Sequence, residues 1–167
     1  MLGLQILSTK LFMNQLLTED SFSSFLLESA SVTTFNTFSI DGRIHPEFYN
    51  KEDDTYDEKT KYSFSKYMDL QEYLFQIIKG SRTPLQIKMT LLLMPEATEK
   101  LLTANDCTVS PAQIAGFVLN MKYDGTKIFL TTAISYSGFT MDKSAEPIWD
   151  NAVKKFLSSK EISYEEI

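Results

Sequence analysis

Hydrophobic and polar residues alternate along several short segments of the chain, which is typical of β-strands that bury one face. The alternation is cleanest over residues 85–93, where apolar side chains recur at every second position. Residues 2–6 alternate in the same way, and residues 22–44 contain strand-forming stretches that predict two strands with a bend between them. These segments predict a sheet whose strands each keep one face toward a core.

The strongest local signal is Asp124-Gly125, which lies between two further alternating segments. A two-residue Asp-Gly loop matches the twist of antiparallel strands, because both loop positions need a positive φ. The pattern therefore predicts an antiparallel hairpin with its apolar residues on one face. The expected neighbours are Met121 beside Ile128 and Leu119 beside Leu130.

Other segments place apolar residues three to four positions apart, which is the spacing of an amphipathic helix. Such stripes predict helices over residues 67–78 and 148–157, and shorter helices near residue 10 and after Pro95. Gly80 follows the first long stripe, where a left-handed C-terminal cap is expected. The residues at the C-terminus are expected to fray.

The predicted elements follow the order strand, helix, two strands, acidic loop, helix, strand, short helix, hairpin and helix. This order is not a regular alternation of strand and helix, so it favours an α+β fold over a doubly wound parallel sheet. We expect a largely antiparallel, twisted sheet of about five to six strands packed against three to four helices. A chain of 167 residues without a linker or a repeat fits a single domain.

Composition changes sharply at about residues 46–63, where charged residues dominate and apolar periodicity is lost. A charge run of this kind is usually a solvated segment, so we expect an acidic, mobile loop here. Asp53-Asp54-Thr55-Tyr56-Asp57 matches the spacing of a motif that binds magnesium and diphosphate. That chemistry needs a helical bundle with a second acidic motif, so we interpret the match as fortuitous.

The chain is acidic overall, with a formal net charge of -6. Contacts with a phosphate backbone depend on clustered basic residues, so the lack of a basic stripe disfavours nucleic acid as a partner. A single cysteine, Cys107, excludes an intrachain disulfide and is compatible with a reducing compartment. No apolar run approaches the roughly 20 residues of a membrane helix, and the first residues lack signal-peptide features. We therefore expect a cytoplasmic protein without membrane contact.

Familiar catalytic motifs are absent from the sequence. There is no glycine-rich phosphate loop, no Gly-x-Ser-x-Gly elbow and no His-Glu-x-x-His pair. The only histidine, His45, precedes Pro46, which favours an exposed, extended loop position over a role as general base. We therefore predict no catalytic residue, no metal ligand and no cofactor, and we favour a protein that is not an enzyme.

Arginine usage gives the best candidate for a binding site. Only two of sixteen basic residues are arginine, Arg43 and Arg82, and both lie just beyond a glycine that ends an element. An arginine presents a planar fork suited to carboxylate or phosphate. The plainer interpretation is that each arginine caps a helix or pairs with a nearby acid. The functional hypothesis is a single anion-binding or partner-binding site, for which the candidate residues are Arg43, Arg82, Lys79, His45, Asp41, Thr34 and Asn36.

Four stretches carry a resemblance to a known family: Thr33-Thr34-Phe35-Asn36-Thr37-Phe38-Ser39-Ile40-Asp41-Gly42-Arg43, Lys79-Gly80-Ser81-Arg82-Thr83-Pro84, Tyr123-Asp124-Gly125 and Trp149-Asp150. In these stretches the sequence resembles a domain-of-unknown-function family of short proteins from anaerobic Gram-positive bacteria. The resemblance spans nearly the whole chain. It implies a bacterial, cytoplasmic setting, and because the family has no assigned activity it implies no function.

Three hypotheses about function follow. The leading one is a non-enzymatic binding or interaction module whose partner is an unknown protein or a small anionic ligand. The alternative is a small hydrolase or transferase for an anionic substrate, with Arg43 and Arg82 as the clamp and His45 or Asp41 as base. A clamp-like or other nucleic-acid-associated subunit would need a basic concave face, which the acidic composition disfavours. The oligomeric state does not follow from the sequence.

Overall fold

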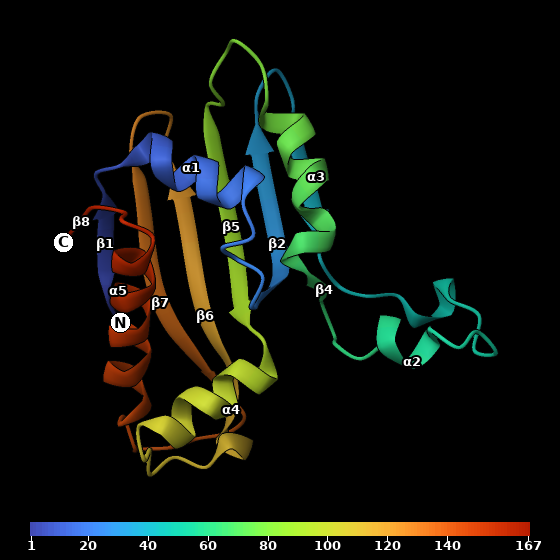
Figure 1. The fold of residues 1–167 in the computed structure, drawn as a ribbon, viewed down its shortest axis with the longest axis vertical. Helices are drawn as coiled ribbons and strands as arrows, with labels where there is room; N and C mark the ends of the chain where they lie inside the picture. The colour runs from blue at the N-terminus through green and yellow to red at the C-terminus, as the bar shows by residue number, and fades with distance from the viewer.

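The computed structural model describes residues 1–167 and shows an α+β fold built on one antiparallel sheet of eight strands (Figure 1). The strands are β1 (Gly3–Ile6), β2 (Phe25–Thr33), β3 (Thr37–Asp41), β4 (Ser65–Lys66), β5 (Gln86–Leu93), β6 (Ile114–Tyr123), β7 (Ile128–Tyr136) and β8 (Tyr164–Glu166). The helices are α1 (Thr9–Thr18), α2 (Tyr56–Lys59), α3 (Tyr67–Ile78), α4 (Pro95–Ala104) and α5 (Ala145–Ser159). Short 3-10 turns span Pro46–Phe48 and Pro111–Gln113.

The strand order across the sheet is β3-β2-β5-β6-β7-β1-β8, and β4 also pairs with β2. The sheet has eight strands, more than the five to six that the pattern predicts, because β4 and β8 are too short to show an alternation. The expectation that the C-terminus frays is wrong. Strand β8 pairs with β1, where Glu166 lies opposite Leu4, and Ile167 N donates a 3.0 Å hydrogen bond to Gly3 O.

The β6–β7 hairpin forms at the predicted place, but its register differs from the prediction. Tyr123 pairs with Ile128, and a four-residue loop replaces the two-residue turn. The cause is Asp124, whose carboxylate accepts hydrogen bonds from the N–H groups of Thr126 and Lys127 at 2.9 and 2.8 Å. The observed pairs are Met121 with Leu130 and Leu119 with Thr132. A shift of two residues keeps every side chain on its expected face, because the side-chain period of a strand is two.

The long helices α1, α3 and α5 lie on one face of the sheet, and α4 lies at the end where β5 leads into it (Figure 1). Side chains on the helix-bearing face are buried, as Ile87, Met89 and Leu91 are on β5. The opposite face carries no helix and is mixed, with an apolar row made of Leu26, Leu92 and Val118 across β2, β5 and β6 and polar residues elsewhere. On it Lys88 and Lys122 are exposed and lie opposite one another on β5 and β6. No helix combines the length and the apolar character that crossing a membrane requires.

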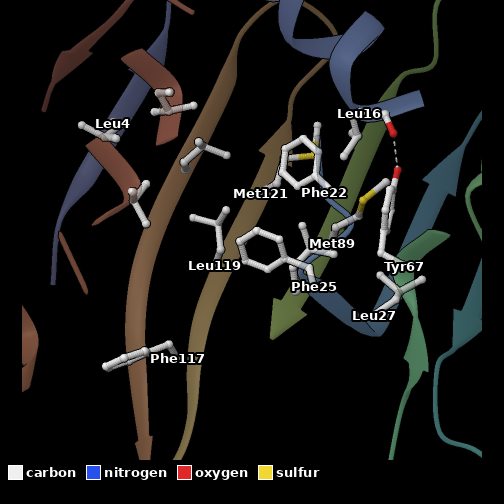
Figure 2. Close-up of a cluster of buried hydrophobic side chains, with 14 of the residues drawn as sticks. Leu4, Leu16, Phe22, Phe25, Leu27, Tyr67, Met89, Phe117, Leu119 and Met121 are labelled. Carbon is white, nitrogen blue, oxygen red and sulfur yellow. Dashed lines mark hydrogen bonds between the residues drawn. The ribbon is translucent and has the colours of Figure 1, made fainter. Parts of the chain in front are cut away.

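Aromatic side chains fill the space between the helices and the sheet (Figure 2). Phe22, in the segment before β2, packs against Phe12 of α1 and Tyr67 of α3, with both ring-centroid distances at 5.9 Å. The Tyr67 hydroxyl donates a 2.7 Å hydrogen bond to Leu16 O, and burial raises its pKa. This contact joins α3 to α1. The segment before β2 is therefore held between α1 and α3, which fixes the position of the strand pair β2–β3.

The C-terminal helix is fixed by Trp149, as its apolar stripe predicts. The indole stacks on Phe117 of β6 at 5.1 Å with an interplanar angle of 5°, and its Nε1 donates to Val118 O at 2.8 Å. Trp149, Val153 and Leu157 are buried on one side of α5. A buried Trp whose N–H has a hydrogen-bond partner is a stable core residue, so Trp149 anchors α5 to the sheet.

Candidate functional site

The predicted site residues gather around the strand pair β2–β3. Val32 lies opposite Phe38 in an antiparallel register without a bulge. At one end the strands join through a tight turn, in which Thr34 N donates a 2.8 Å hydrogen bond to Asn36 O. At the other end Gly42 N donates to Glu28 O at 2.9 Å, and the chain leaves the sheet. The two ends of this pair carry different candidate residues.

A pocket of about 460 Å³ lies at the turn end, between the β2–β3 turn and the segment that links α3 to β5. We call it the end pocket; its lining is Thr34 and Phe35 of the turn, residues 77–83 and Leu85. Helix α3 ends at Ile78, and Gly80 follows with a φ of +135°, a conformation that L side chains rarely adopt. The sequence predicts a left-handed cap at Gly80; the φ is positive, but neither Gly80 N nor Ser81 N donates back to α3, whose last hydrogen bond is from Lys79 N to Phe75 O at 2.8 Å. Leu85 N then donates to Thr33 O at 2.8 Å, which holds the linking segment against the end of β2.

The charge of the end pocket is opposite to that of the whole protein. Lys79 and Arg82 are both exposed at its rim, and neither forms a salt bridge. No Asp or Glu lines the pocket. Two cations without a neutralising carboxylate create a local positive potential, which attracts an anion even when the net charge of the chain is -6.

One wall of the end pocket contains a polar atom without a partner. The Thr34 hydroxyl oxygen is buried and makes no hydrogen bond. Leaving a buried hydroxyl unpaired costs roughly 1–3 kcal/mol. Thr34 lines the pocket, so rotation about its Cα–Cβ bond toward a ligand that accepts or donates a hydrogen bond would recover that cost. The lining also contains apolar groups: Phe35 and Leu85 are 87% and 67% exposed, respectively, and lie beside Ile77 and Ile78.

The composition of the end pocket determines what it can do chemically. Its lining includes no carboxylate, imidazole or thiol that could serve as base, nucleophile or metal ligand. Over the whole chain, no three His, Cys, Asp or Glu side chains are grouped closely enough to hold a metal ion. The pocket therefore provides charge, hydroxyl groups and an apolar surface, which are the elements of a binding site.

Arg43 lies at the other end of β3, and its side chain contacts another residue of the same chain. Its guanidinium lies 5.6 Å from the centroid of the Phe64 ring, and its backbone forms an isolated bridge with the same residue. Arg43 N donates to the Asp41 carboxylate at 3.0 Å, so Asp41 closes the local turn. Both observations match the plainer interpretation of an arginine that is used for structure.

The remaining candidates also lie outside the end pocket. His45 Nδ1 is 3.3 Å from the Glu47 carboxylate, and both side chains are exposed. Asn36 belongs to the β2–β3 turn through its backbone, and its side chain does not line the pocket. Thr34, Lys79 and Arg82 are thus the candidates that the structure brings together.

The two arginines do not share a site. Arg43 lies six positions after Thr37 along extended chain, a span of about 20 Å at the rise of a β-strand. Arg82 lies near the start of that span and Arg43 at its end. A clamp made from both arginines, as the enzyme hypothesis requires, does not form.

The acidic segment follows Arg43 and is largely exposed, as predicted, although it includes the turn Pro46–Phe48 and helix α2. The Asp53 carboxylate accepts hydrogen bonds from the backbone and hydroxyl of Thr55, which lower its pKa. Lys61 joins the end of the segment to Glu96 of α4 at 2.7 Å. The segment is therefore attached at both of its ends to the body of the protein.

Sequence reasoning missed part of the end pocket. Phe35, Leu85, Ser81 and Thr83 line it, yet none of them was among the candidate site residues. One signal was available, because Phe35 is an aromatic residue in a turn made otherwise of Thr and Asn. An exposed aromatic in such a place is typical of a contact surface.

The fold and the pocket together define a class: an α+β protein with a helix layer on one face of an antiparallel sheet and a cationic pocket at one sheet end. The chain belongs to the DUF5721 family, a family of unknown function whose model matches residues 15–165. The predicted resemblance to a domain-of-unknown-function family is confirmed to that extent. The comparisons with curated proteins and with solved structures give no match.

Proposed function

We propose that this protein is a non-enzymatic binding module that recognises a small anionic ligand in the end pocket. The observation that carries the proposal is the buried, unpaired hydroxyl of Thr34 in the wall of a pocket that also presents Lys79 and Arg82. Folding leaves both a polar atom and two cations without partners at one place. An anion with hydrogen-bonding oxygens would satisfy all three.

The lining indicates the chemical class of the ligand. Arg82 offers a fork that matches a phosphate or carboxylate, and Lys79 adds a second charge. Phe35 and Leu85 offer an apolar surface to the rest of the ligand. A volume of about 460 Å³ lies within the range of small-molecule sites. We infer a metabolite-sized molecule with an anionic group at one end and a flat or apolar part at the other.

The hydrolase or transferase hypothesis has less support. With Arg43 outside the pocket, the anion would have one arginine, and the proposed bases His45 and Asp41 lie at the far end of β3 with Arg43. The bacterial and cytoplasmic setting implied by the resemblance stays a prediction. Binding without chemical conversion is the proposal that the residues support.

Titration calorimetry with a panel of nucleotides, sugar phosphates and dicarboxylates tests the proposal. We expect at least one class to bind, and Arg82→Ala or Lys79→Ala to weaken that binding by about tenfold or more, since charge-assisted hydrogen bonds are lost. Arg43→Ala is the matched control, because it removes the same side chain from the other end of β3. Equal weakening by Arg43→Ala, or no binding by any panel member, would contradict the proposal.

Thr34→Val separates ligand binding from folding. Valine has nearly the same shape as threonine and removes a hydroxyl that makes no hydrogen bond in the unliganded protein. We expect the free energy of unfolding to stay the same or to rise by about 1 kcal/mol, because a desolvated polar atom is removed. Ligand affinity should fall at the same time. A loss of stability without a loss of affinity would show that the hydroxyl has a structural role.

A further inference from the structure

Strand β3 is a free edge of the sheet, since β2 is its only neighbour within the sheet order. Hydrogen-bonded and non-hydrogen-bonded pairs alternate along an antiparallel ladder. The bonds from Thr34 N to Asn36 O and from Gly42 N to Glu28 O identify the bonded pairs at the two ends. By alternation, Phe38 and Ile40 direct their backbone groups toward β2.

The intervening residues direct their N–H and C=O groups away from the sheet. These residues are Thr37, Ser39 and Asp41, and all three are exposed. A row of outward backbone donors and acceptors is a template on which another strand can pair. The β3 edge therefore offers hydrogen bonds that the protein itself leaves unused.

Proteins usually protect such edges with lysine, proline, a bulge or a very short strand. Strand β3 contains no lysine or proline, and its pairing with β2 has no register shift. The opposite edge is different, because β8 has three residues, two of which are Glu165 and Glu166. The β8 edge is thus protected against strand addition by its shortness and its negative charge, and the β3 edge is not.

The side chains along the β3 edge are suited to a pairing strand. Phe38 and Ile40 lie opposite the buried residues Val32 and Ala30, so they face the helix side of the sheet, and both are only half-buried. Phe35 packs edge-to-face on Phe38 at 5.8 Å and is itself 87% exposed. An added strand with apolar side chains at alternate positions would cover this apolar strip.

Charge defines the partner further. The acidic segment follows the Asp41 end of the edge and projects sideways from the sheet (Figure 1). Its six carboxylates outnumber its three lysines, Lys51, Lys59 and Lys61, and form one salt bridge, between Glu47 and His45; the six are Glu47, Glu52, Asp53, Asp54, Asp57 and Glu58. Basic residues next to the docked strand would therefore be attracted. A second copy of this chain would instead bring its own net charge of -6.

We propose that β3 is a docking strand to which an extended segment of a partner protein adds as a further strand. The segment has apolar residues at alternate positions and Lys or Arg where it passes the acidic segment. Backbone hydrogen bonds to Thr37, Ser39 and Asp41 give affinity, and the apolar strip and the carboxylates give specificity. This partner differs from the ligand of the end pocket, and the backbone groups that bind it do not line that pocket.

The key variant is Ser39→Pro in the full chain. Proline removes the outward N–H of Ser39 and blocks strand addition, but it leaves the bonds to β2 intact, as edge strands allow. Glu166→Pro is the matched control, because residues opposite Leu4 and Ile6 point their backbone groups away from β1 at the β8 edge. Urea unfolding of each variant verifies that the fold is retained.

The probe is a phage-displayed library of random peptides, selected on the wild-type chain. We expect enriched peptides to alternate apolar residues and to carry Lys or Arg at one end, and to lose binding by about tenfold or more on Ser39→Pro. Glu166→Pro should bind them as the wild type does. An enriched peptide with N-methyl groups on alternate amides should also lose binding, a result that does not depend on any variant folding.

Three outcomes would overturn the proposal. The first is that the selected peptides bind the wild-type chain no better than the Ser39→Pro variant. The second is that their consensus sequence lacks alternating apolar residues or contains acidic residues. The third concerns the competing occupant. A concentration-dependent dimer in analytical ultracentrifugation that Ser39→Pro abolishes would show that a second copy, rather than a peptide, pairs with β3.

Discussion

The segments Gly42-Arg43 and Gly80-Ser81-Arg82 look alike in sequence, since each puts an arginine just after a glycine that ends an element. The two glycines are required for different reasons. A Cβ at Gly42 would lie 1.7 Å from Leu27 O, so the limit is space. Gly80 has a φ of +135° and no atom within 4 Å of a Cβ, so the limit is backbone conformation.

The arginines differ in a parallel way. Arg43 stacks on Phe64 and its backbone bridges to the same residue, whereas Arg82 projects from a loop with no salt-bridge partner beside the end pocket. Close strand packing around Gly42 brings the guanidinium of its neighbour to an aromatic ring. The open loop around Gly80 leaves Arg82 available. A glycine–arginine pair therefore marks a binding site only where the loop is not packed.

Gly42→Ala should have the largest effect on stability. The added methyl overlaps Leu27 O, a backbone atom of β2 at a point where β2 pairs with both β4 and β5 and cannot move without disturbing that pairing. We expect a loss of about 3 kcal/mol or more in the free energy of unfolding, measured by urea titration. Gly138→Ala is the control, since a Cβ there meets nothing within 4 Å and the φ of Gly138 is not positive. A loss below 1 kcal/mol, on the order of an ordinary surface change, would contradict the steric argument.

Gly80→Ala should have a smaller effect, because space is available and only the backbone is strained. An L residue at this φ costs about 1–2 kcal/mol. Gly138→Ala again serves as control, since the two sites share open surroundings and differ in φ. The change also moves the loop that carries Arg82, so anion binding should weaken together with stability. Unchanged stability would mean that the loop relaxes freely to a common conformation.

Replacing the arginines should also destabilise the Gly42-Arg43 segment more than the Gly80-Ser81-Arg82 segment, but both losses of stability should be smaller than those caused by the glycine variants. Arg43→Ala removes a cation–π contact at an exposed site, and we expect a loss of about 0.5–1 kcal/mol of stability. Arg82→Ala should change stability by no more than a few tenths of a kcal/mol, because no salt bridge is broken. Thermal unfolding of both variants beside the wild type measures the difference. A larger loss for Arg82→Ala would reverse the roles assigned to the two segments.

Local patterns predicted most of the fold for a physical reason. A strand of β5's length or a helix such as α5 repeats its buried face several times, so its period is readable. Strands β4 and β8 have two and three residues, and a pattern that short has no period. The hairpin register depends on one carboxylate, that of Asp124, because its hydrogen bonds from the N–H groups of Thr126 and Lys127 set the loop length.

The candidate site was predicted in part. The sequence marked Arg82, Lys79 and Thr34, and these residues do come together. It could not separate Arg43 from them, because the separation depends on which end of β3 each segment reaches, and that is a matter of long-range strand pairing. The unpaired hydroxyl of Thr34 could not be predicted either, since burial of a single side-chain atom depends on tertiary packing that a local pattern does not contain.

The smallest expected effect concerns how the acidic segment beyond Arg43 is attached. Lys61 lies 2.7 Å from Glu96 on α4, and the Tyr62 hydroxyl donates to the same carboxylate at 2.9 Å. The Lys61 ammonium, with help from backbone and Tyr62 donors, lowers the pKa of Glu96 from 4.5 to about 2. Between these values the folded state binds fewer protons than the unfolded state, so stability from this carboxylate is present above pH 4.5 and is lost as the pH falls toward 2.

Glu96→Gln should therefore flatten the pH dependence of unfolding over that acidic range, by a small amount because both partners are about half exposed. Glu99→Gln, an exposed carboxylate on the same helix without a salt bridge, should leave the profile as in the wild type. Urea midpoints measured at several pH values give the comparison. Identical profiles for Glu96→Gln and the wild type would show that the acidic segment is held by its link to β3 and β4 and gains nothing from α4. The Gly42-Arg43 end would then depend on strand packing alone, as the effect of Gly42→Ala predicts.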